Sequence, residues 1–160
     1  MQLNYSYNTP MGAAGGIVDL APHYIASFTN EAATGAVMFG MGVVTGSAAG
    51  LGVVVPDSDS TATDFEGIVT NRRTTELDLE GNLTLRNKCA LGVMRWGVIY
   101  ALLADGATPE YGDALYMVKS GTDAGKFTDS SSSTVAIKGR FLSAADNGVA
   151  IVELFNQAQS

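Results

Sequence analysis

The fold is decided by residues 135–155, which read Val135-Ala-Ile-Lys-Gly-Arg-Phe-Leu142, then Ser143-Ala-Ala-Asp-Asn-Gly148, then Val149-Ala-Ile-Val-Glu-Leu-Phe155. Two short apolar runs flank a polar linker, which is the pattern of two strands joined by a turn. The pair Asn147-Gly148 supplies the positive φ angles that a tight turn requires. We therefore predict two closing strands over 135–142 and 149–155.

The chain before this hairpin shows the same pattern of short apolar runs and turns. Short apolar runs alternate with turn signals at intervals of roughly 8 to 15 residues, which is typical of a β-sandwich or β-barrel. The denser run 92–103 suits a buried strand or a short helix, and its Gly97 and β-branched Val98-Ile99 favour the strand. The remaining strands are expected at 37–44, 52–55, 65–70, 77–80, 83–86, 111–118 and 126–128.

The first 21 residues differ from the rest because no strand or helix period is visible in them. Polar and aromatic residues come first, followed by a Gly-Ala run. Such a segment is either a frayed end or an arm that orders on a neighbouring protein. Tyr5, Tyr7 and Met11 are residue types that interfaces favour, so they are the anchors of the arm reading. The predicted organisation is an all-β chain with an extended N-terminal arm (1–21) and a single β-barrel or jelly-roll-like sandwich domain (22–160).

The charge of the chain limits its partners. Nine basic and sixteen acidic residues give a net charge of −7, so the protein as a whole repels nucleic acid and anionic lipid. Charged residues make up only 16% of the chain, which is low for a surface fully exposed to water and implies that partner protein covers part of it. The apolar stretch 35–55 has membrane length, but its glycines divide it into strand-length runs. We expect no nucleic-acid partner and no membrane partner.

Residues that carry ordinary catalysis are scarce. His23 is the only histidine and lies far in sequence from any Ser, Cys or carboxylate cluster of catalytic spacing. With the single Cys89, it cannot complete a zinc site of usual composition within one chain. The acidic segment 57–66 offers oxygen ligands but lacks the Gly and terminal Glu of a calcium loop. The expectation is a protein that is not an enzyme and has no cofactor, no metal site and no catalytic residue.

One basic pair stands out in this acidic chain, Arg72-Arg73. Two readings are open: a solvated turn balanced by the nearby acids, or a guanidinium fork that binds a carboxylate of a partner protein, for which Arg is better suited than Lys. Together with the arm anchors, Arg72 and Arg73 complete the set of candidate partner-binding residues. Trp96 is expected in the core rather than at an interface.

Several phrases of the chain are similar to a known family. They are 111–116 (Tyr-Gly-Asp-Ala-Leu-Tyr), 125–128 (Gly-Lys-Phe-Thr), 136–141 (Ala-Ile-Lys-Gly-Arg-Phe), 148–154 (Gly-Val-Ala-Ile-Val-Glu-Leu) and the opening 5–11. The pattern resembles the small β-barrel decoration, or cement, proteins of tailed-bacteriophage heads. The resemblance spans most of the chain, but between residues 35 and 73 it lies only in the general sequence pattern and not in particular phrases.

The resemblance implies a function and partners. Members of this family are expected to bind the outer surface of the capsid as homodimers or homotrimers and to bridge subunits of a major capsid protein of HK97-like fold. The chain would then be made in the host bacterial cytoplasm and end in the virion, on the capsid exterior. Two alternatives are another virion component, such as a tail or head-completion protein, and a β-sandwich ligand-binding module.

Overall fold

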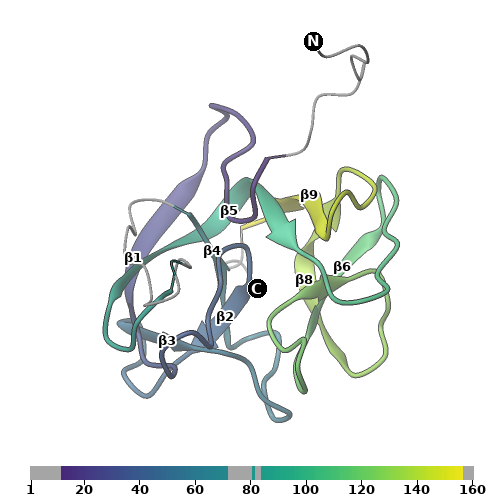
Figure 1. Ribbon diagram of the computed structural model, residues 1–160. Helices are drawn as coiled ribbons and strands as arrows, with labels where there is room; N and C mark the ends of the chain where they lie inside the picture. Colours follow the sequence, from purple (N-terminus) through teal and green to yellow (C-terminus); the bar gives the residue numbers. More distant parts are fainter. Residues whose placement is uncertain (1–11, 72–80, 82–83, 157–160) are drawn as a thin grey trace.

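The computed structural model describes residues 12–71, 81 and 84–156, and over these residues the chain forms strands and no helix (Figure 1). The prediction of an all-β chain built on a β-barrel is confirmed. Among the described residues, none belongs to a helix with the length and hydrophobicity needed to cross a membrane. The strands are β1 (Tyr24–Asn30), β2 (Gly42–Thr45), β3 (Gly52–Val54), β4 (Phe65–Val69), β5 (Ala90–Leu102), β6 (Ala114–Val118), β7 (Phe127–Thr128), β8 (Thr134–Phe141) and β9 (Val149–Leu154).

The first half of the chain closes into a barrel. Its strands follow the order β1-β3-β2-β4-β5, and β5 pairs back onto β1, so the sheet has no free end (left half of Figure 1). The closing ladder is antiparallel and runs from Tyr24↔Trp96 to Thr29↔Ala90. Among the pairings of the described barrel strands, only that of β1 with β3 is parallel. Closure removes the open edge at which sheets of different molecules would otherwise pair.

The second half builds a sheet on the remainder of β5. Its order is β5-β9-β8-β6-β7, and all of these pairings are antiparallel (right half of Figure 1). An isolated parallel bridge, Leu103↔Phe127, links β7 back to the residue that follows β5. The second sheet therefore curls almost into a barrel of its own.

Strand β5 is shared by the two halves. Residues up to Trp96 pair with β1, whereas Gly97 to Leu102 pair with β9. The change occurs at a bulge in the β1–β5 ladder, and Gly97 has a φ of 131°. A Cβ at this position would lie 2.6 Å from the Cβ of His23, so only glycine fits the bend. We call this point the junction.

The apolar side chains form two cores. One fills the barrel and contains Phe28, Val37, Val43, Val53, Val69, Leu85, Leu91 and Val93. The other lies between the outer wall of the barrel and the second sheet, where Phe65 of β4 meets Phe127 of β7 edge to face at 6.4 Å. Consecutive residues of one strand point into different cores, as Val93 and Met94 do. For this reason β4 is buried along its whole length and β2 at three of its four residues.

The closing hairpin has the expected geometry. Asn147 and Gly148 both adopt positive φ, at 51° and 74°, and a bridge joins Asp146 to Val149. The strands pair from Phe141↔Val152 to Gly139↔Leu154. The hydroxyl of Ser143 also accepts a hydrogen bond from the Ile151 N–H at 2.9 Å.

Three details of the sequence-based strands are wrong, and one of them is that the strand expected over 111–118 begins only at Ala114. The strand expected over 37–44 begins only at Gly42, and Val37 reaches the barrel core from a turn. Strand β1 was not anticipated, although it closes the barrel. The hairpin expected over 77–86 lies largely outside the described residues.

Part of the expected N-terminal arm is described, from residue 12 onward. The Gly15 N–H donates to the Tyr100 carbonyl at 2.8 Å, and the Tyr100 N–H donates to the Gly16 carbonyl at 3.0 Å. A bridge between Ile17 and Ile99 continues this contact along β5. These residues therefore lie against the barrel, whereas residues 1–11 lie outside the described part.

Candidate partner-binding surfaces

The five candidate partner-binding residues, Tyr5, Tyr7, Met11, Arg72 and Arg73, all lie outside the described residues. Two described positions close to them in sequence do meet. The Asn71 N–H donates to the Gly15 carbonyl at 2.9 Å, so the point before Arg72 adjoins the segment that follows Met11.

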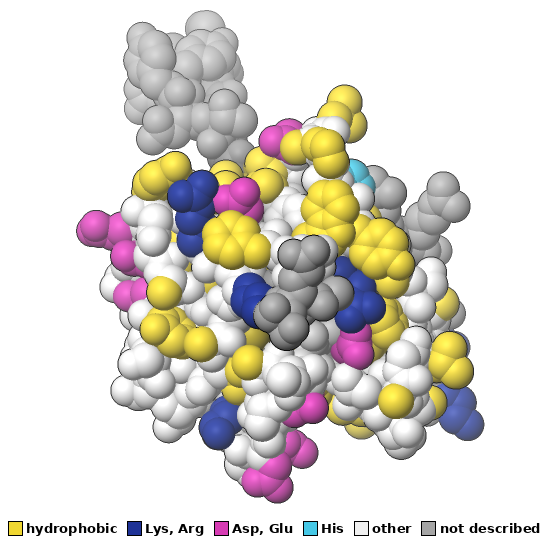
Figure 2. Space-filling view, turned by 180° about the vertical axis from the view of Figure 1, so that it is seen from behind, with side chains coloured by type: hydrophobic (Ala, Val, Ile, Leu, Met, Phe, Trp, Pro, Cys, Tyr) yellow, Lys and Arg dark blue, Asp and Glu magenta, His cyan; other side chains and the backbone are white. Residues whose placement is uncertain are grey.

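Large apolar side chains reach the surface at separate places. Figure 2 shows one face, where hydrophobic side chains gather in the upper half beside Lys and Arg side chains. The most exposed are Leu20 (101% exposed) and Leu51 (71%). Single exposed apolar residues are ordinary in soluble proteins, so position and rigidity must decide which of them can act as contacts. The other exposed large hydrophobic residues are Tyr24, Met38, Tyr111 and Phe155.

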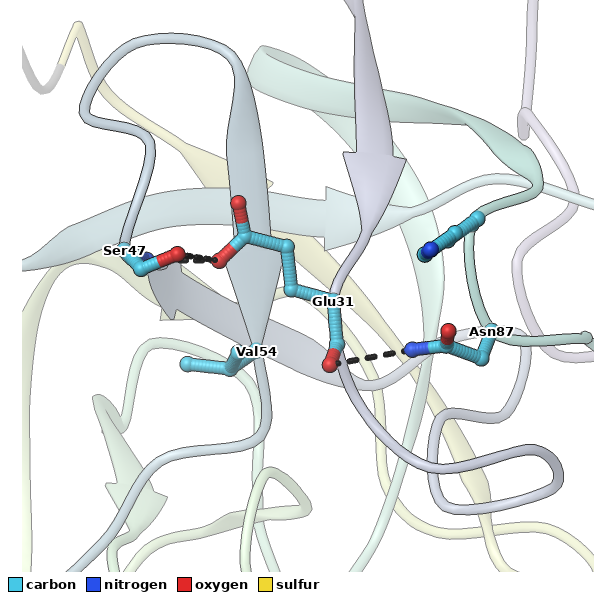
Figure 3. A pocket seen from close by; sticks show the side chains of 5 residues that line it. Glu31, Ser47, Val54 and Asn87 are labelled. Carbon is cyan, nitrogen blue, oxygen red and sulfur yellow. Dashed lines mark hydrogen bonds between the residues drawn. The ribbon is translucent and has the colours of Figure 1, made fainter.

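Leu51 is carried on a loop that Glu31 holds in place (Figure 3). The Glu31 carboxylate accepts hydrogen bonds from the Ser47 N–H at 2.6 Å, the Ser47 hydroxyl at 2.9 Å and the Ala48 N–H at 3.1 Å. The Ser47 hydroxyl and N–H together lower the pKa of Glu31, so the carboxylate stays charged. A Cβ on Gly52 would collide with this carboxylate, which explains the glycine there. The loop after β2 is therefore fixed to the end of β1.

The hollow beside Glu31 measures about 500 Å³ and is lined by Glu31, Ser47, Val54, Asn87 and Lys88 (Figure 3). The Asn87 amide in its lining donates to the carbonyls of Glu31 at 3.2 Å and Ala32 at 2.9 Å. These hydrogen bonds join the loop that contains Asn87 to the loop that follows β1. Sequence reasoning missed this connection, although one signal was present: Glu31 is the only carboxylate between Asp19 and Asp57.

A second hollow, of about 260 Å³, opens at the junction. It is lined by Tyr24 of β1, Arg95 and Trp96 of β5, and Asn156 after β9. Trp96, expected in the core, is only partly buried and forms part of this wall. The Arg95 guanidinium lies 3.0 Å from the largely buried carboxylate of Glu66.

A third hollow is almost wholly apolar. It measures about 330 Å³ and is lined by Ala13, Ala14, Val37, Met38, Phe39, Leu85 and Leu102.

On the outer face of the second sheet, Arg140 donates to Glu153 at 2.9 Å and lies 5.9 Å from the ring centre of the exposed Tyr111.

The side chains that could take part in catalysis or metal binding make local contacts within the protein. His23 Nδ1 lies 2.9 Å from the Ala21 carbonyl, and Cys89 packs against the barrel core. In the acidic loop, the Thr61 hydroxyl and N–H bind Asp64 and lower its pKa. Within the described ranges, no three His, Cys, Asp or Glu side chains are grouped so that they could hold a metal ion. The described part thus offers braced loops and separate contact residues.

These features define a β-barrel protein with large apolar side chains exposed at separate places and with loops held by internal hydrogen bonds. The comparisons with known proteins give the family. The model of a family described as structural cement protein (E217 gp24/Pam3 gp6) matches residues 1–155, so the chain belongs to the phage structural cement proteins. The resemblance read from the sequence is confirmed.

One solved structure supports the fold independently. A chain from the structure titled "The capsid of Myoviridae Phage XM1" superimposes with a TM-score of 0.74 at 19% identity, over 96% of both chains. At this identity the likeness concerns the fold. No curated protein matches the sequence.

Proposed function

We propose that this protein binds the outer surface of a phage capsid and stabilises the shell by bridging neighbouring major capsid protein subunits, of HK97-like fold. The observation that carries the proposal is the match of residues 1–155 to the structural cement family. The similar fold of a chain from a phage capsid structure agrees with it. The protein would act without catalysis or cofactor and would reside on the exterior of the virion after synthesis in the host bacterial cytoplasm.

The proposal rests physically on many weak contacts that act together. Each contact need be only modest, because a protein that binds two or three subunits at once gains from the high effective concentration of the second site. Self-association as a homodimer or homotrimer would multiply this gain. A net charge of −7 keeps the protein away from packaged nucleic acid and therefore favours contacts made through protein.

We assign the first contact to the N-terminal segment. Tyr5, Tyr7 and Met11 would be its apolar anchors on a neighbouring subunit, with the backbone adding a strand to that subunit's sheet. Arg72 and Arg73 would bind a carboxylate nearby, which is consistent with the hydrogen bond between Asn71 and Gly15. Under this proposal the arm comprises residues 1–21 and the barrel domain residues 22–160.

Co-sedimentation with phage shells that lack this protein tests the proposal. The wild-type chain should pellet with the shells, and the triple variant Tyr5→Ala/Tyr7→Ala/Met11→Ala should bind at least about 10-fold more weakly, as expected for loss of interface anchors. The variant Asn4→Ala/Asn8→Ala changes polar residues of the same segment and serves as the matched control. Failure of the wild-type chain to bind any shell would refute the function, and labelled protein located on the tail would favour another virion role.

A second variant separates the two proposed contact elements. Arg72→Gln/Arg73→Gln should weaken binding, and the loss should shrink as salt is raised because salt screens an exposed charge pair. The purified protein should have the mass of a dimer or trimer by light scattering. Binding that is unchanged in both sets of variants would mean that the contacts lie elsewhere on the barrel.

A further inference from the structure

The hollow at the junction differs from the rest of the surface in the residues that form it. Tyr24 is 49% exposed, and the β1–β5 register places it directly across from Trp96. The β5–β9 register ends at Gly97↔Leu154, and its continuation by two residues brings Asn156 opposite Arg95. One hollow is thus built from three chain segments that meet only in the folded barrel.

Arg95 has hydrogen-bonding capacity to spare. The only ion pair or hydrogen bond of its guanidinium with the described residues is the contact in which Nη2 lies 3.0 Å from Glu66 Oε2. That oxygen is buried and accepts no hydrogen bond from any described residue, so its contact with Arg95 is an ion pair that leaves the other guanidinium N–H groups without a partner among the described residues. The side chain of Arg95 is 33% exposed, whereas that of Glu66 is 12% exposed. The ion pair with Glu66 therefore fixes one end of a partly exposed guanidinium that also lines the hollow.

The composition of the hollow identifies the kind of ligand it suits. Tyr, Trp and Arg are the residue types that carry most of the binding energy in protein interfaces, particularly around a concave centre. The aromatic walls suit an apolar side chain, and a guanidinium with unused donors suits a carboxylate, which it can bind through two parallel hydrogen bonds. The Arg95 guanidinium repels a cation, and the net charge of −7 disfavours a phosphate-rich ligand.

We propose that the junction hollow is a second docking site, and that it receives a segment of the shell subunit in which an apolar side chain lies beside an acidic one. The inference rests on the proposed function, because it takes the shell subunit as the partner. It adds a contact on the folded barrel, separate from the N-terminal segment. Charge complementarity at Arg95 is the argument for an acidic partner, and the aromatic walls are the argument for its apolar neighbour.

The decisive variants keep the barrel intact. Arg95→Lys preserves the charge beside Glu66 but loses the planar fork, and Tyr24→Ser removes a half-exposed ring without opening either core. Each should weaken binding to shells lacking this protein by about 10-fold or more. Arg140→Lys is the matched control, because Arg140 is also paired with a carboxylate but already donates a hydrogen bond to Glu153 at 2.9 Å. The control should bind as wild type does.

Circular dichroism and thermal unfolding establish that each variant is folded before its binding is compared. If wild-type protein binds and both hollow variants bind equally well, the hollow is not a docking site, although the proposed function stands. If all three variants weaken binding equally, the effect is general and the inference fails. If the variants change the oligomer mass but not shell binding, the occupant is a second copy of the protein. If a chain ending at Asn156 shows no difference in binding between wild type and Arg95→Lys, the occupant is the protein's own C-terminus. Either result overturns the proposal.

Discussion

The barrel and the second sheet differ in how far apart in sequence their paired strands lie. In the second sheet, neighbouring strands β8 and β9 are close in sequence and are joined by the Asn147-Gly148 turn. In the barrel, the closing pair is β1 with β5, whose partners Phe28 and Leu91 are 63 residues apart (91 − 28). Local turn chemistry can set the β8–β9 hairpin alone, although the attachment of β9 to β5 is also a long-range pairing. The closure of the barrel depends on strands that meet only when the whole barrel has collapsed, and it is therefore harder than the hairpin to read from sequence.

The largest effect is expected from emptying either core. Phe127→Ala removes a ring that is fully buried between barrel and second sheet, and Leu91→Ala removes a side chain from the barrel core, at costs of about 3 to 5 and about 2 to 5 kcal/mol of unfolding free energy. Because β5 supplies side chains to both cores, urea unfolding should show one transition in each variant. Two separate transitions in either variant would mean that the barrel and the second sheet unfold independently.

A smaller effect is expected at the junction. Gly97→Ala forces a side chain into a φ of 131° and against His23, which should cost about 2 to 3 kcal/mol. Gly148→Ala in the hairpin meets no atom within 4 Å and should cost only about 1 kcal/mol, the price of its positive φ. Denaturation midpoints measure both. Equal costs would show that the bend of β5 does not depend on glycine.

The smallest effect concerns Glu31 and its pH dependence. The pKa of this carboxyl is lowered in the folded protein, so its stabilising contribution is present above its ordinary pKa and is lost as the pH falls through the lowered value. Glu31→Gln should therefore be less stable than wild type at pH 7, and the difference should shrink below about pH 4. Thermal unfolding across this range tests it, with Glu110→Gln as an exposed carboxylate control. A stability difference that does not change with pH would contradict the assigned role of the charge.

Much of the fold was accessible from sequence where local signals act. Strands β3, β4, β8 and β9 were anticipated at nearly their observed positions because apolar runs end at glycines or polar turns. β1 was missed since Tyr24–Asn30 mixes exposed and buried positions, and what defines the strand is its pairing with β5. The strand expected at 37–44 was too long because Val37 is buried from a turn, and burial alone does not distinguish the two.

The contact surfaces were less accessible. The junction hollow combines Tyr24, Arg95 and Asn156, which are far apart in sequence and come together only through the registers of β5 with β1 and β9. Glu31 looked like an isolated acid because its partners are the Ser47 hydroxyl and backbone N–H groups, which no side-chain motif records. The predicted anchors Tyr5, Tyr7 and Met11 and the pair Arg72-Arg73 remain predictions to be tested by binding.

Heating of phage shells with and without this protein tests the central claim most directly. The shells are prepared without the protein, saturated with the purified chain, and followed by light scattering and release of their contents as temperature rises. The account predicts that the bound protein raises the temperature of shell disruption, and that Tyr5→Ala/Tyr7→Ala/Met11→Ala raises it less at equal concentration. A protein that coats the shells yet leaves their disruption temperature unchanged would contradict the claim that it holds subunits together.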